Sequence, residues 1–413
     1  TKDMPYGIYT VHQVSGWEGS ELMPDFDVFI SQNGATYRYL INNAPFNSFI
    51  KIVKQDAETG KTIPYAGAGF KIYDPDGNPV TMTFTYPTPT TIDVFYTNAE
   101  GSLVTPEKLP FGKGYSIVEV QAPYGYVLDE TPVYFDVTED NSTEESGVTV
   151  VKVDKPNMAQ KGTITVEKTG EVFFGVSVIG GVDESGNELP TIYQPQYEKR
   201  GLPGAVYEII AAEDIITPDG TVRNQKGNFV DTVTTDENGT AVSRELYLGK
   251  YEVREITAPH GMVLNPEPHC VELVYAGQNV AVTETATSFE NERQKVEISL
   301  VKSIEQNERF GIGTNGEMKN ISFGLFAAEE IVSASGTSIP ANGLVEIISL
   351  NEDGTAKIKT DLPFGSYYVQ ELATDSHYKL SDTKYPVTFG YASQDTAVVL
   401  SLIHISEPTR PYD

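Results

Sequence analysis

Four segments of this chain are variants of one heptapeptide, Gly249-Lys250-Tyr251-Glu252-Val253-Arg254-Glu255. In each variant a tyrosine follows closely on a glycine, and an acid or an amide stands four residues after the tyrosine: Tyr9 with Gln13, Tyr115 with Glu119, Tyr251 with Glu255, and Tyr367 with Glu371. Side chains on one face of a β-strand recur every second residue, so the tyrosine, the valine and the final acid of the heptapeptide face the same way. The pattern therefore predicts strands that turn a carboxyl group toward a hydrophobic core.

A buried carboxyl group is costly unless it is neutral or has a partner, so each repeat should supply one. A second regularity supplies it, because three asparagines each precede a lysine by eleven residues: Asn43 and Lys54, Asn157 and Lys168, and Asn291 and Lys302. Each repeat then has a lysine in its first strand, a glutamate in a middle strand and an asparagine at its end.

These three residue types can react with one another. Burial favours the neutral form of both an amine and a carboxylic acid, so the lysine becomes a nucleophile and the acid a proton donor. The acid can polarise the asparagine carboxamide oxygen and pass a proton to the departing ammonia, which leaves a Lys–Asn isopeptide bond. Folding supplies the dry, aligned site, so we expect no cofactor, no metal and no enzymatic turnover beyond this single reaction.

The overall composition excludes several classes of protein. The chain has 413 residues with 58 acidic and 29 basic side chains, a net charge of -29, and no basic cluster that would bind nucleic acid. Its single cysteine, Cys270, rules out internal disulfides, and we expect this thiol to be packed and inert. No apolar run is long enough to span a membrane.

Alternation with a period of two, interrupted by short turns, predicts an all-β fold built as an elongated tandem array of sandwich modules. Short helical segments are expected only at residues 211–215 and 327–331. The sequence divides as follows: residues 1–44, the C-terminal remnant of an upstream β-module with strands at 7–14, 26–31 and 36–41; residues 45–158, a first complete module; residues 159–292, a second module with a long insert; residues 293–401, a third module that lacks its closing strand; and residues 402–413, a tail that resembles translated sequencing-adapter DNA and is treated as non-native.

The repeats resemble the Cna B-type (SpaA-like, prealbumin-like) domains of Gram-positive cell-wall-anchored surface proteins and pilins. The likeness is carried by two Gly-Ala segments, Gly67-Ala68-Gly69-Phe70 and Gly204-Ala205-Val206-Tyr207, and by Glu-x-x-Ala-Pro-x-Gly at residues 119–125 and 255–261. The resemblance implies isopeptide bonds that form without an enzyme. Carried over by position, it implies two complete triads: Lys54, Glu119 and Asn157, then Lys168, Glu255 and Asn291.

The chain also departs from this pattern. Asp154 stands three residues before Asn157 and is an alternative acceptor for Lys54. The third unit has Lys302 and Glu371 but no asparagine after Asn351, so its triad is incomplete. The N-terminal remnant has Gln13 in place of the acid, and Asn43 is expected to stay unreacted.

We therefore predict a stalk fragment of an extracellular, cell-wall-anchored Gram-positive adhesin or pilin-like protein. The resemblance implies that sortase and peptidoglycan are its partners through a missing C-terminus, because no Leu-Pro-x-Thr-Gly motif occurs here. One alternative is a ligand-binding adhesin module that contacts a host protein or glycan, with Trp17 and the insert at residues 174–197 as candidate contact regions. Another is a set of accessory β-domains of a secreted enzyme.

Overall fold

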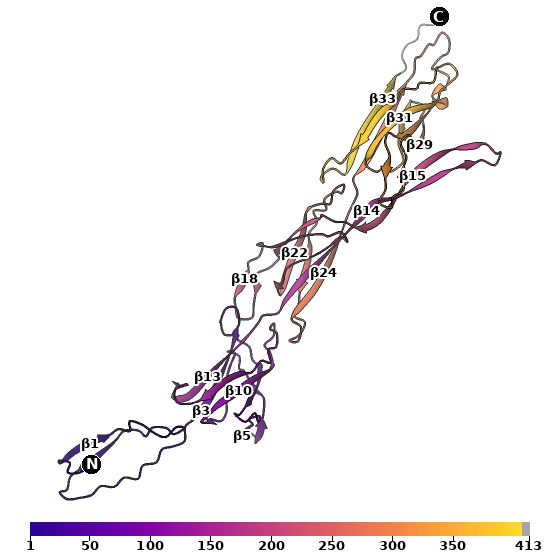
Figure 1. The fold of residues 1–413 in the computed structure, drawn as a ribbon. Coiled ribbons are helices and arrows are strands. Elements are labelled where there is room, and N and C mark those ends of the chain that lie inside the picture. Colours follow the sequence, from indigo (N-terminus) through magenta and orange to yellow (C-terminus); the bar gives the residue numbers. More distant parts are fainter. Residues whose placement is uncertain (407–413) are drawn as a thin grey trace.

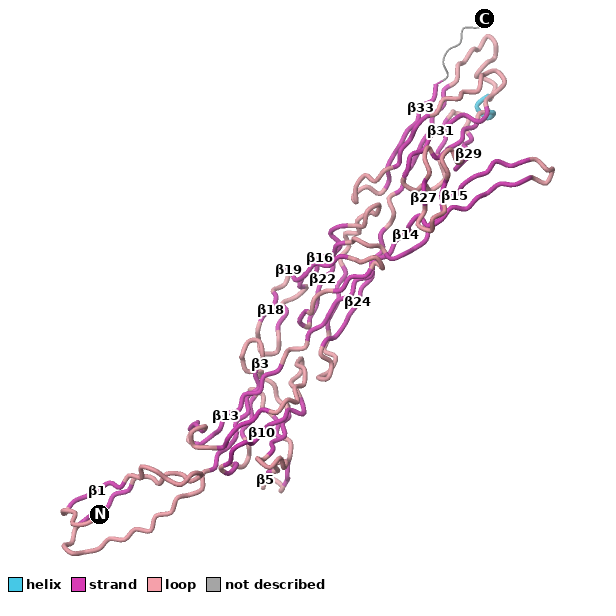
Figure 2. Tube along the Cα trace, viewed as in Figure 1, coloured by secondary structure: helices cyan, strands magenta, loops and turns pink. Residues whose placement is uncertain are grey.

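The alternating sequence forms 33 strands and one short 3-10 turn in the computed structural model, which describes residues 1–406. Figure 1 shows these strands gathered into modules that follow one another along a single long axis. The amino terminus and the last described strand lie at opposite ends of this axis. Colouring by secondary structure shows that strands and loops make up nearly all of the array (Figure 2).

The first module is a sandwich of two sheets with strand orders β11-β10-β4-β7 and β12-β13-β3-β8, and β9 also pairs with β3. Its first long strand runs parallel to its last, with Lys54 in register with Lys155. Inward-facing hydrophobic residues of both sheets, among them Ile50, Phe70 and Ile117, form the core. The strands are β3 (Asn47–Asp56), β4 (Gly69–Tyr73), β5 (Met82–Phe84), β6 (Thr90–Ile92), β7 (Phe95–Tyr96), β8 (Ser102–Val104), β9 (Leu109–Pro110), β10 (Gly112–Gln121), β11 (Val133–Val137), β12 (Ser142–Glu145) and β13 (Val148–Asn157).

The second module repeats this plan. One sheet has the order β19-β16-β22-β23, and the facing sheet pairs the first strand, β14, in parallel with the last strand, β24. The strands are β14 (Lys161–Val182), β15 (Glu188–Gly201), β16 (Val206–Ala211), β17 (Ile215–Ile216), β18 (Val222–Asn224), β19 (Phe229–Thr234), β20 (Thr240–Val242), β21 (Leu246–Tyr247), β22 (Gly249–Thr257), β23 (His269–Leu273) and β24 (Val282–Asn291).

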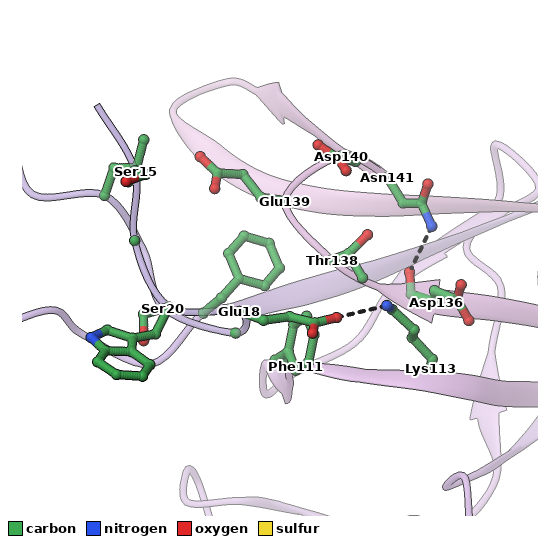
Figure 3. Close-up of a pocket in the computed structure, with 15 residues that line it drawn as sticks. Ser15, Glu18, Ser20, Phe111, Lys113, Asp136, Thr138, Glu139, Asp140 and Asn141 are labelled. Carbon is green, nitrogen blue, oxygen red and sulfur yellow. Dashed lines mark hydrogen bonds and ion pairs between the residues drawn. The ribbon is translucent and has the colours of Figure 1, made fainter. Parts of the chain in front are cut away.

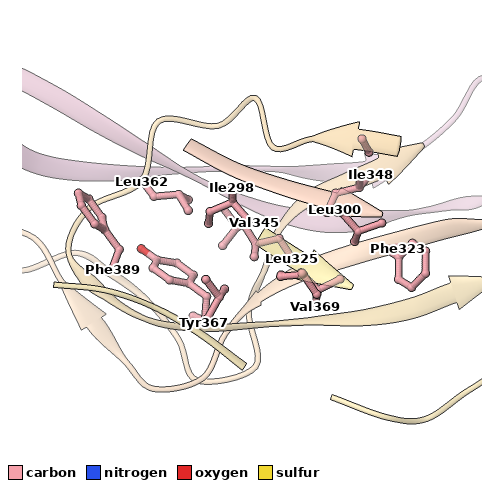
Figure 4. Packing of buried hydrophobic residues seen from close by; sticks show 14 of the residues in the cluster. Ile298, Leu300, Phe323, Leu325, Val345, Ile348, Leu362, Tyr367, Val369 and Phe389 are labelled. Atoms are coloured by element: carbon pink, nitrogen blue, oxygen red, sulfur yellow. The ribbon is translucent and has the colours of Figure 1, made fainter. Parts of the chain in front are cut away.

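The third module has the same two layers, β29-β26-β31-β32 against β30-β25-β33. Figure 4 shows its core, in which Leu300, Leu325 and Val369 meet between the layers. The elements are β25 (Lys295–Ser303), η1 (Glu317–Asn320), β26 (Ser322–Ala327), β27 (Ile331–Val332), β28 (Ser338–Ile339), β29 (Leu344–Ser349), β30 (Thr355–Lys357), β31 (Gly365–Ala373), β32 (Tyr385–Phe389) and β33 (Val398–Ser406).

The third module also corrects an expectation. We expected no closing strand there, but β33 runs through Ser406 and pairs in parallel with β25, with Ile405 in register with Lys302. Alternate residues Ile403 and Ile405 are buried, so the first part of the segment set aside as a tail has the alternation that a closing strand requires. Residues 407–413 lie outside the described part of the chain.

Three smaller expectations were wrong. Residues 36–41 are not a strand, because β1 (Gly7–Val11) pairs with β2 (Phe26–Ile30) instead. The segments at 211–215 and 327–331 are not helical, since each joins the end of one strand to the start of another. Cys270 is exposed rather than packed, because it lies on the opposite face of β23 from the buried Leu273, so that the thiol points outward.

The long insert of the second module is a β-hairpin, formed by the distal parts of β14 and β15, that leans on the third module (Figure 1). Ile192, about midway along the hairpin, pairs with Leu344 of β29, and Phe173 and Tyr193 pack against the third core. The hairpin tip is exposed to solvent, as Val182 and Leu189 show. The predicted insert at residues 174–197 therefore joins the second module to the third.

Arg293 stabilises the contact between the hairpin and the third module, and replacing Arg293 should weaken that contact. Its buried guanidinium lies 3.7 Å from the Tyr197 ring centroid and donates two hydrogen bonds to Asp361 of the third module. Because the Asp361 side chain is 42% exposed, we expect Arg293→Ala to lower the free energy of unfolding of the third module by about 2 kcal/mol, measured by denaturant titration. The matched control is Lys199→Ala, which breaks an exposed ion pair between Lys199 of β15 and Glu290 of β24 and should cost less than about 0.5 kcal/mol. Equal losses in the two variants would contradict the assigned role of Arg293.

Candidate functional site

The first site lies inside the first module, where three strands bring together residues far apart in the sequence. Lys54 stands near the end of β3, Glu119 on β10 and Asn157 at the end of β13. Parallel pairing of β3 with β13 places Asn157 two residues beyond the position opposite Lys54. All three side chains are at most 1% exposed, so the predicted triad is assembled in a dry site.

The distances within this triad suit a reaction between the amine and the amide. Lys54 Nζ lies 2.6 Å from Glu119 Oε1 and is in direct contact with Asn157 Oδ1. Asn157 Nδ2 donates to Glu119 Oε2 at 2.6 Å and to the Val127 carbonyl at 2.7 Å. The glutamate thus touches the amide nitrogen, which is the leaving group, rather than the amide oxygen that the sequence-based mechanism assigned to it.

The surroundings of Lys54 make its amine easier to deprotonate than that of an exposed lysine. Burial lowers the pKa of the Lys54 amine from 10.5 to about 8, and it outweighs the opposing influence of Glu119. The Phe70 ring, whose centroid lies 5.5 Å from Nζ, helps to exclude water from this end of the site. Phe70 is in register with Glu119, so the aromatic residue of the Gly-Ala segment covers the acid from the neighbouring strand.

The second site has Lys168, Glu255 and Asn291 in the same arrangement, without the direct contact between lysine and asparagine. Lys168 Nζ lies 2.8 Å from Glu255 Oε1, and Asn291 Nδ2 donates to Glu255 Oε2 at 2.9 Å and to the Val263 carbonyl at 2.6 Å. Burial lowers the pKa of Lys168, and Tyr207 is in register with Glu255. Among the described residues, Asn291 Oδ1 has no hydrogen-bond partner, and Lys168 Nζ has none in hydrogen-bond geometry beside its ion pair with Glu255, so the amine nitrogen and the amide oxygen of the prospective reactants are both unsatisfied.

The third module and the N-terminal segment hold partial versions of the site. Lys302 Nζ lies 3.3 Å from Glu371 Oε1, and the sequence contains no asparagine after Asn351 to act as the acceptor. In the N-terminal segment, Asn43 Nδ2 donates to Gln13 Oε1 at 3.1 Å, so an amide pair occupies the place of the acid and the acceptor.

Asp154 is not part of the first site. Its side chain is 43% exposed and pairs with Lys152 at 3.1 Å, because it alternates with Lys155 and Asn157 on β13 and faces the other way. This geometry corrects the alternative in which Asp154 was the acceptor for Lys54. Lys155 is instead a second buried lysine, and it donates to Asp129 Oδ2 at 2.8 Å.

Sequence reasoning missed the loop that holds each triad. A backbone N–H ten residues after each acid donates to its Oε2 atom: Asp129 to Glu119, Asn265 to Glu255 and Ser381 to Glu371. Met23 donates in the same way to Gln13. The carbonyl eight residues after the acid or amide accepts from the asparagine in three copies, through Glu21, Val127 and Val263. The available signal was the Glu-x-x-Ala-Pro-x-Gly segment, because in both copies these backbone groups lie at the same distance in sequence from its glutamate.

A separate cavity of about 570 Å³ lies between the N-terminal segment and the first module. Figure 3 shows Glu18 from the segment paired with Lys113 of β10 at 2.7 Å beside Thr138 and Glu139. Trp17 lines this cavity and is 84% exposed. No helix within residues 1–406 has the length and hydrophobicity needed to cross a bilayer.

Comparison with known proteins identifies the repeats. The model of a family described as SpaA, prealbumin-like fold domain, matches residues 48–152, 194–287 and 306–401. These matches cover more than half of the chain. The gap at residues 153–193 contains the end of β13, all of β14 and the start of β15.

Individual relatives are more distant. The Trypsin-resistant surface T6 protein of Streptococcus pyogenes serotype M6 is 26% identical over 147 residues, which cover 34% of this chain and 26% of that protein. Among solved structures, the Bacillus anthracis TIE protein has a TM-score of 0.50 and 22% identity over 96% of this chain and 58% of its own. BcpA, the major pilin subunit of Bacillus cereus, has a TM-score of 0.31 and 16% identity over 88% of this chain and 100% of its own. The likeness to the TIE protein shows a shared fold.

Proposed function

The chain belongs to the family of SpaA prealbumin-like fold domains, and from this premise we propose that it is part of a load-bearing stalk on the surface of a Gram-positive bacterium. The two complete modules would each be closed by an isopeptide bond, Lys54 to Asn157 and Lys168 to Asn291. The observation that supports this proposal best is the direct contact of Lys54 Nζ with the Asn157 carboxamide inside a fully buried site.

The proposed reaction needs no other reactant. Neutral Lys54 Nζ attacks the Asn157 carboxamide carbon, a new N–C bond forms, and the bond from that carbon to Nδ2 breaks. Glu119 takes up the proton lost by Nζ and delivers a proton to Nδ2, which it already contacts, so that ammonia leaves. Glu119 ends the reaction in its starting protonation state, whereas Lys54 and Asn157 are consumed.

The position of the bonds gives them a mechanical purpose. In each module the bond would join the first strand to the last, and these two strands also connect to the neighbouring modules through short linkers. Tension that enters through β3 and leaves through β13 would pass through the covalent link, so the residues between them would not unravel. Such a staple needs no oxidising compartment, in keeping with a chain that has one cysteine.

A cell-surface location, with sortase and peptidoglycan as partners through a further C-terminal region, is part of the same proposal. It is supported by the family match and by the sequence similarity to a streptococcal surface protein. The proposed role is structural, and the only chemistry assigned to the chain is its own cross-linking.

Mass spectrometry tests the proposal directly. Each Lys–Asn bond releases ammonia, so the intact chain should be lighter than its sequence mass by about 34 Da. Glu119→Gln and Glu255→Gln should each restore about 17 Da, because an amide cannot carry the proton that the acid carries. Digestion should yield peptides that join Lys54 to Asn157 and Lys168 to Asn291.

Glu371→Gln is the matched control, since the third module has no asparagine at the acceptor position and should keep its mass apart from the substitution itself. An intact chain of unmodified mass that is nevertheless folded would contradict the proposed bonds.

A second candidate function, ligand binding, is favoured by Trp17 on the cavity described above. An exposed indole beside carboxylates and amides is suited to stacking on a sugar ring while the polar groups bind its hydroxyls. Because Trp17 is the only tryptophan in the chain, its fluorescence reports this site selectively. Saturable quenching by a short oligosaccharide, abolished by Asp140→Ala, would support the second function, and unchanged fluorescence across an oligosaccharide panel would count against it.

A further inference from the structure

Each site that we propose to be cross-linked is bordered by a loop that belongs to the next module. The acceptor loops, residues 122–129 and 258–265, carry the carbonyl and the N–H that hold the asparagine and the glutamate of each triad. The junction loops, residues 275–280 and 391–396, follow β23 and β32 in the second and third modules. Each junction loop lies against the acceptor loop of the module before it.

At the first junction, one residue of the junction loop accepts hydrogen bonds from two places in the acceptor loop. The Gln278 side-chain Oε1 accepts from the Ala122 N–H at 2.9 Å, and the Gln278 carbonyl accepts from the Leu128 N–H at 2.9 Å. Leu128 lies between Val127, whose carbonyl holds Asn157, and Asp129, whose N–H holds Glu119. Gln278 therefore fixes the peptide units on which the alignment of the first triad depends.

The second junction repeats this arrangement. Gln394 Oε1 accepts from the Ala258 N–H at 2.9 Å, and the Gln394 carbonyl accepts from the Leu264 N–H at 2.8 Å. Leu264 again lies between the two residues that hold the triad, Val263 and Asn265.

A buried glutamine in each linker holds the junction loop in turn. Gln160 donates to the carbonyls of Gly277 and Val280 and accepts from the Ala276 N–H at 2.8 Å. Gln294 makes the same three contacts with the loop at residues 391–396. Both linker glutamines lie three residues after the acceptor asparagine. The end of the acceptor strand of one module therefore holds the junction loop of the next module, and that junction loop contacts the acceptor loop of the first.

The N-terminal segment, which has no acid in its triad, also lacks these contacts, because no glutamine stands at the corresponding linker and loop positions. Phe46 stands where the other linkers have glutamine, and the corresponding loop of the first module, residues 138–141, contains no glutamine. The cavity of about 570 Å³ opens between this loop and Gly16, the counterpart of Ala122. Packing of one module on another therefore does not by itself produce the glutamine contacts between the junction loop and the acceptor loop.

We infer that Gln278 and Gln394 are positioning residues for the cross-linking reaction of the preceding module, so that each site is completed only when the next module has folded. This inference rests on the proposed function. It implies an order of events, in which the bond between Lys54 and Asn157 forms after the second module has folded onto the first.

The test follows both bonds in the full chain. The chain is collected unfolded in guanidinium, checked by intact mass for the absence of bonds, refolded by dilution, and quenched in acid for peptide mapping. In Gln278→Ala, formation of the Lys54–Asn157 bond should be slower by about 5- to 10-fold, the effect of one lost hydrogen bond at a buried N–H, while the Lys168–Asn291 bond should form at its normal rate. In Gln394→Ala, the second bond should be slowed and the first should not.

Gln278→Glu keeps an acceptor for the Ala122 N–H and should restore the rate of the first bond. A purely structural role of Gln278 would affect its own module, the second, so slowing of both bonds alike, or of neither, would overturn the inference. Absence of both bonds from the unmutated chain would overturn the proposed function and this inference with it.

Discussion

Glu119→Gln should make the first module extensible under force, whereas the unmutated module should resist unravelling. The proposed bond between Lys54 and Asn157 would enclose 103 residues, which would become accessible to tension only in its absence. At roughly 3.4 Å per residue, the variant should release about 350 Å of additional contour length, recorded by single-molecule pulling of the full chain. Gln13, which stands at the same place in the N-terminal segment and keeps the contacts with the asparagine and with the loop N–H, indicates that glutamine fits the site sterically.

The same variant should be less stable in denaturant. Closing a loop of this length stabilises a folded domain by about 4 to 5 kcal/mol on the loop-entropy model, and the first module should lose about that much. Glu371→Gln serves as the control, because it removes an acid at the equivalent position of a module that has no asparagine acceptor. If the unmutated first module released its full length at low force, the proposed load path would be refuted.

The sequence was sufficient to predict the triads because two independent regularities converge on them. Alternation placed Glu119 and Glu255 on the core side of their strands, and the constant interval between asparagine and lysine identified residues that parallel pairing of the first and last strands then brings together. The role of the glutamate within the triad was less predictable, since contact with the amide nitrogen depends on the loop carbonyls that orient the amide.

Contacts between modules could not be predicted in the same way. Gln278 and Ala122 are separated by 156 residues and meet only because the modules stack in one orientation. A signal was nevertheless present, since the junction loops begin with Tyr275-Ala276-Gly277-Gln278 and Tyr391-Ala392-Ser393-Gln394, and both tyrosines pack on an aromatic ring of the acceptor loop. Cys270 was misjudged for a different reason, because hydrophobicity alone does not say which face of a strand is buried.

Bond formation in the first module should depend strongly on pH. Burial lowers the pKa of Lys54 to about 8, and only the neutral amine can attack the carboxamide. The rate of the Lys54–Asn157 bond during refolding should therefore be nearly constant above about pH 9 and fall by about tenfold for each unit below pH 8, which makes it about 100-fold slower at pH 6. Refolding at a series of pH values, followed by acid quench and peptide mapping, measures this profile, and circular dichroism monitors folding separately.

Asn157→Ala provides the matched thermodynamic control, because it retains Lys54 and Glu119 but cannot form the bond. The pKa of the lysine is 10.5 when exposed and about 8 when buried, so between these values the unfolded chain binds more protons than the folded chain. The free energy of unfolding of this variant should consequently rise as the pH increases from about 8 to about 10.5, and Lys54→Met in the same background should abolish the rise. A bond-formation rate that does not change between pH 6 and pH 9 would show that Lys54 is not the titrating nucleophile. If the rate and the free energy of unfolding both rise as Lys54 loses its proton, the burial of Lys54 is connected to its reactivity.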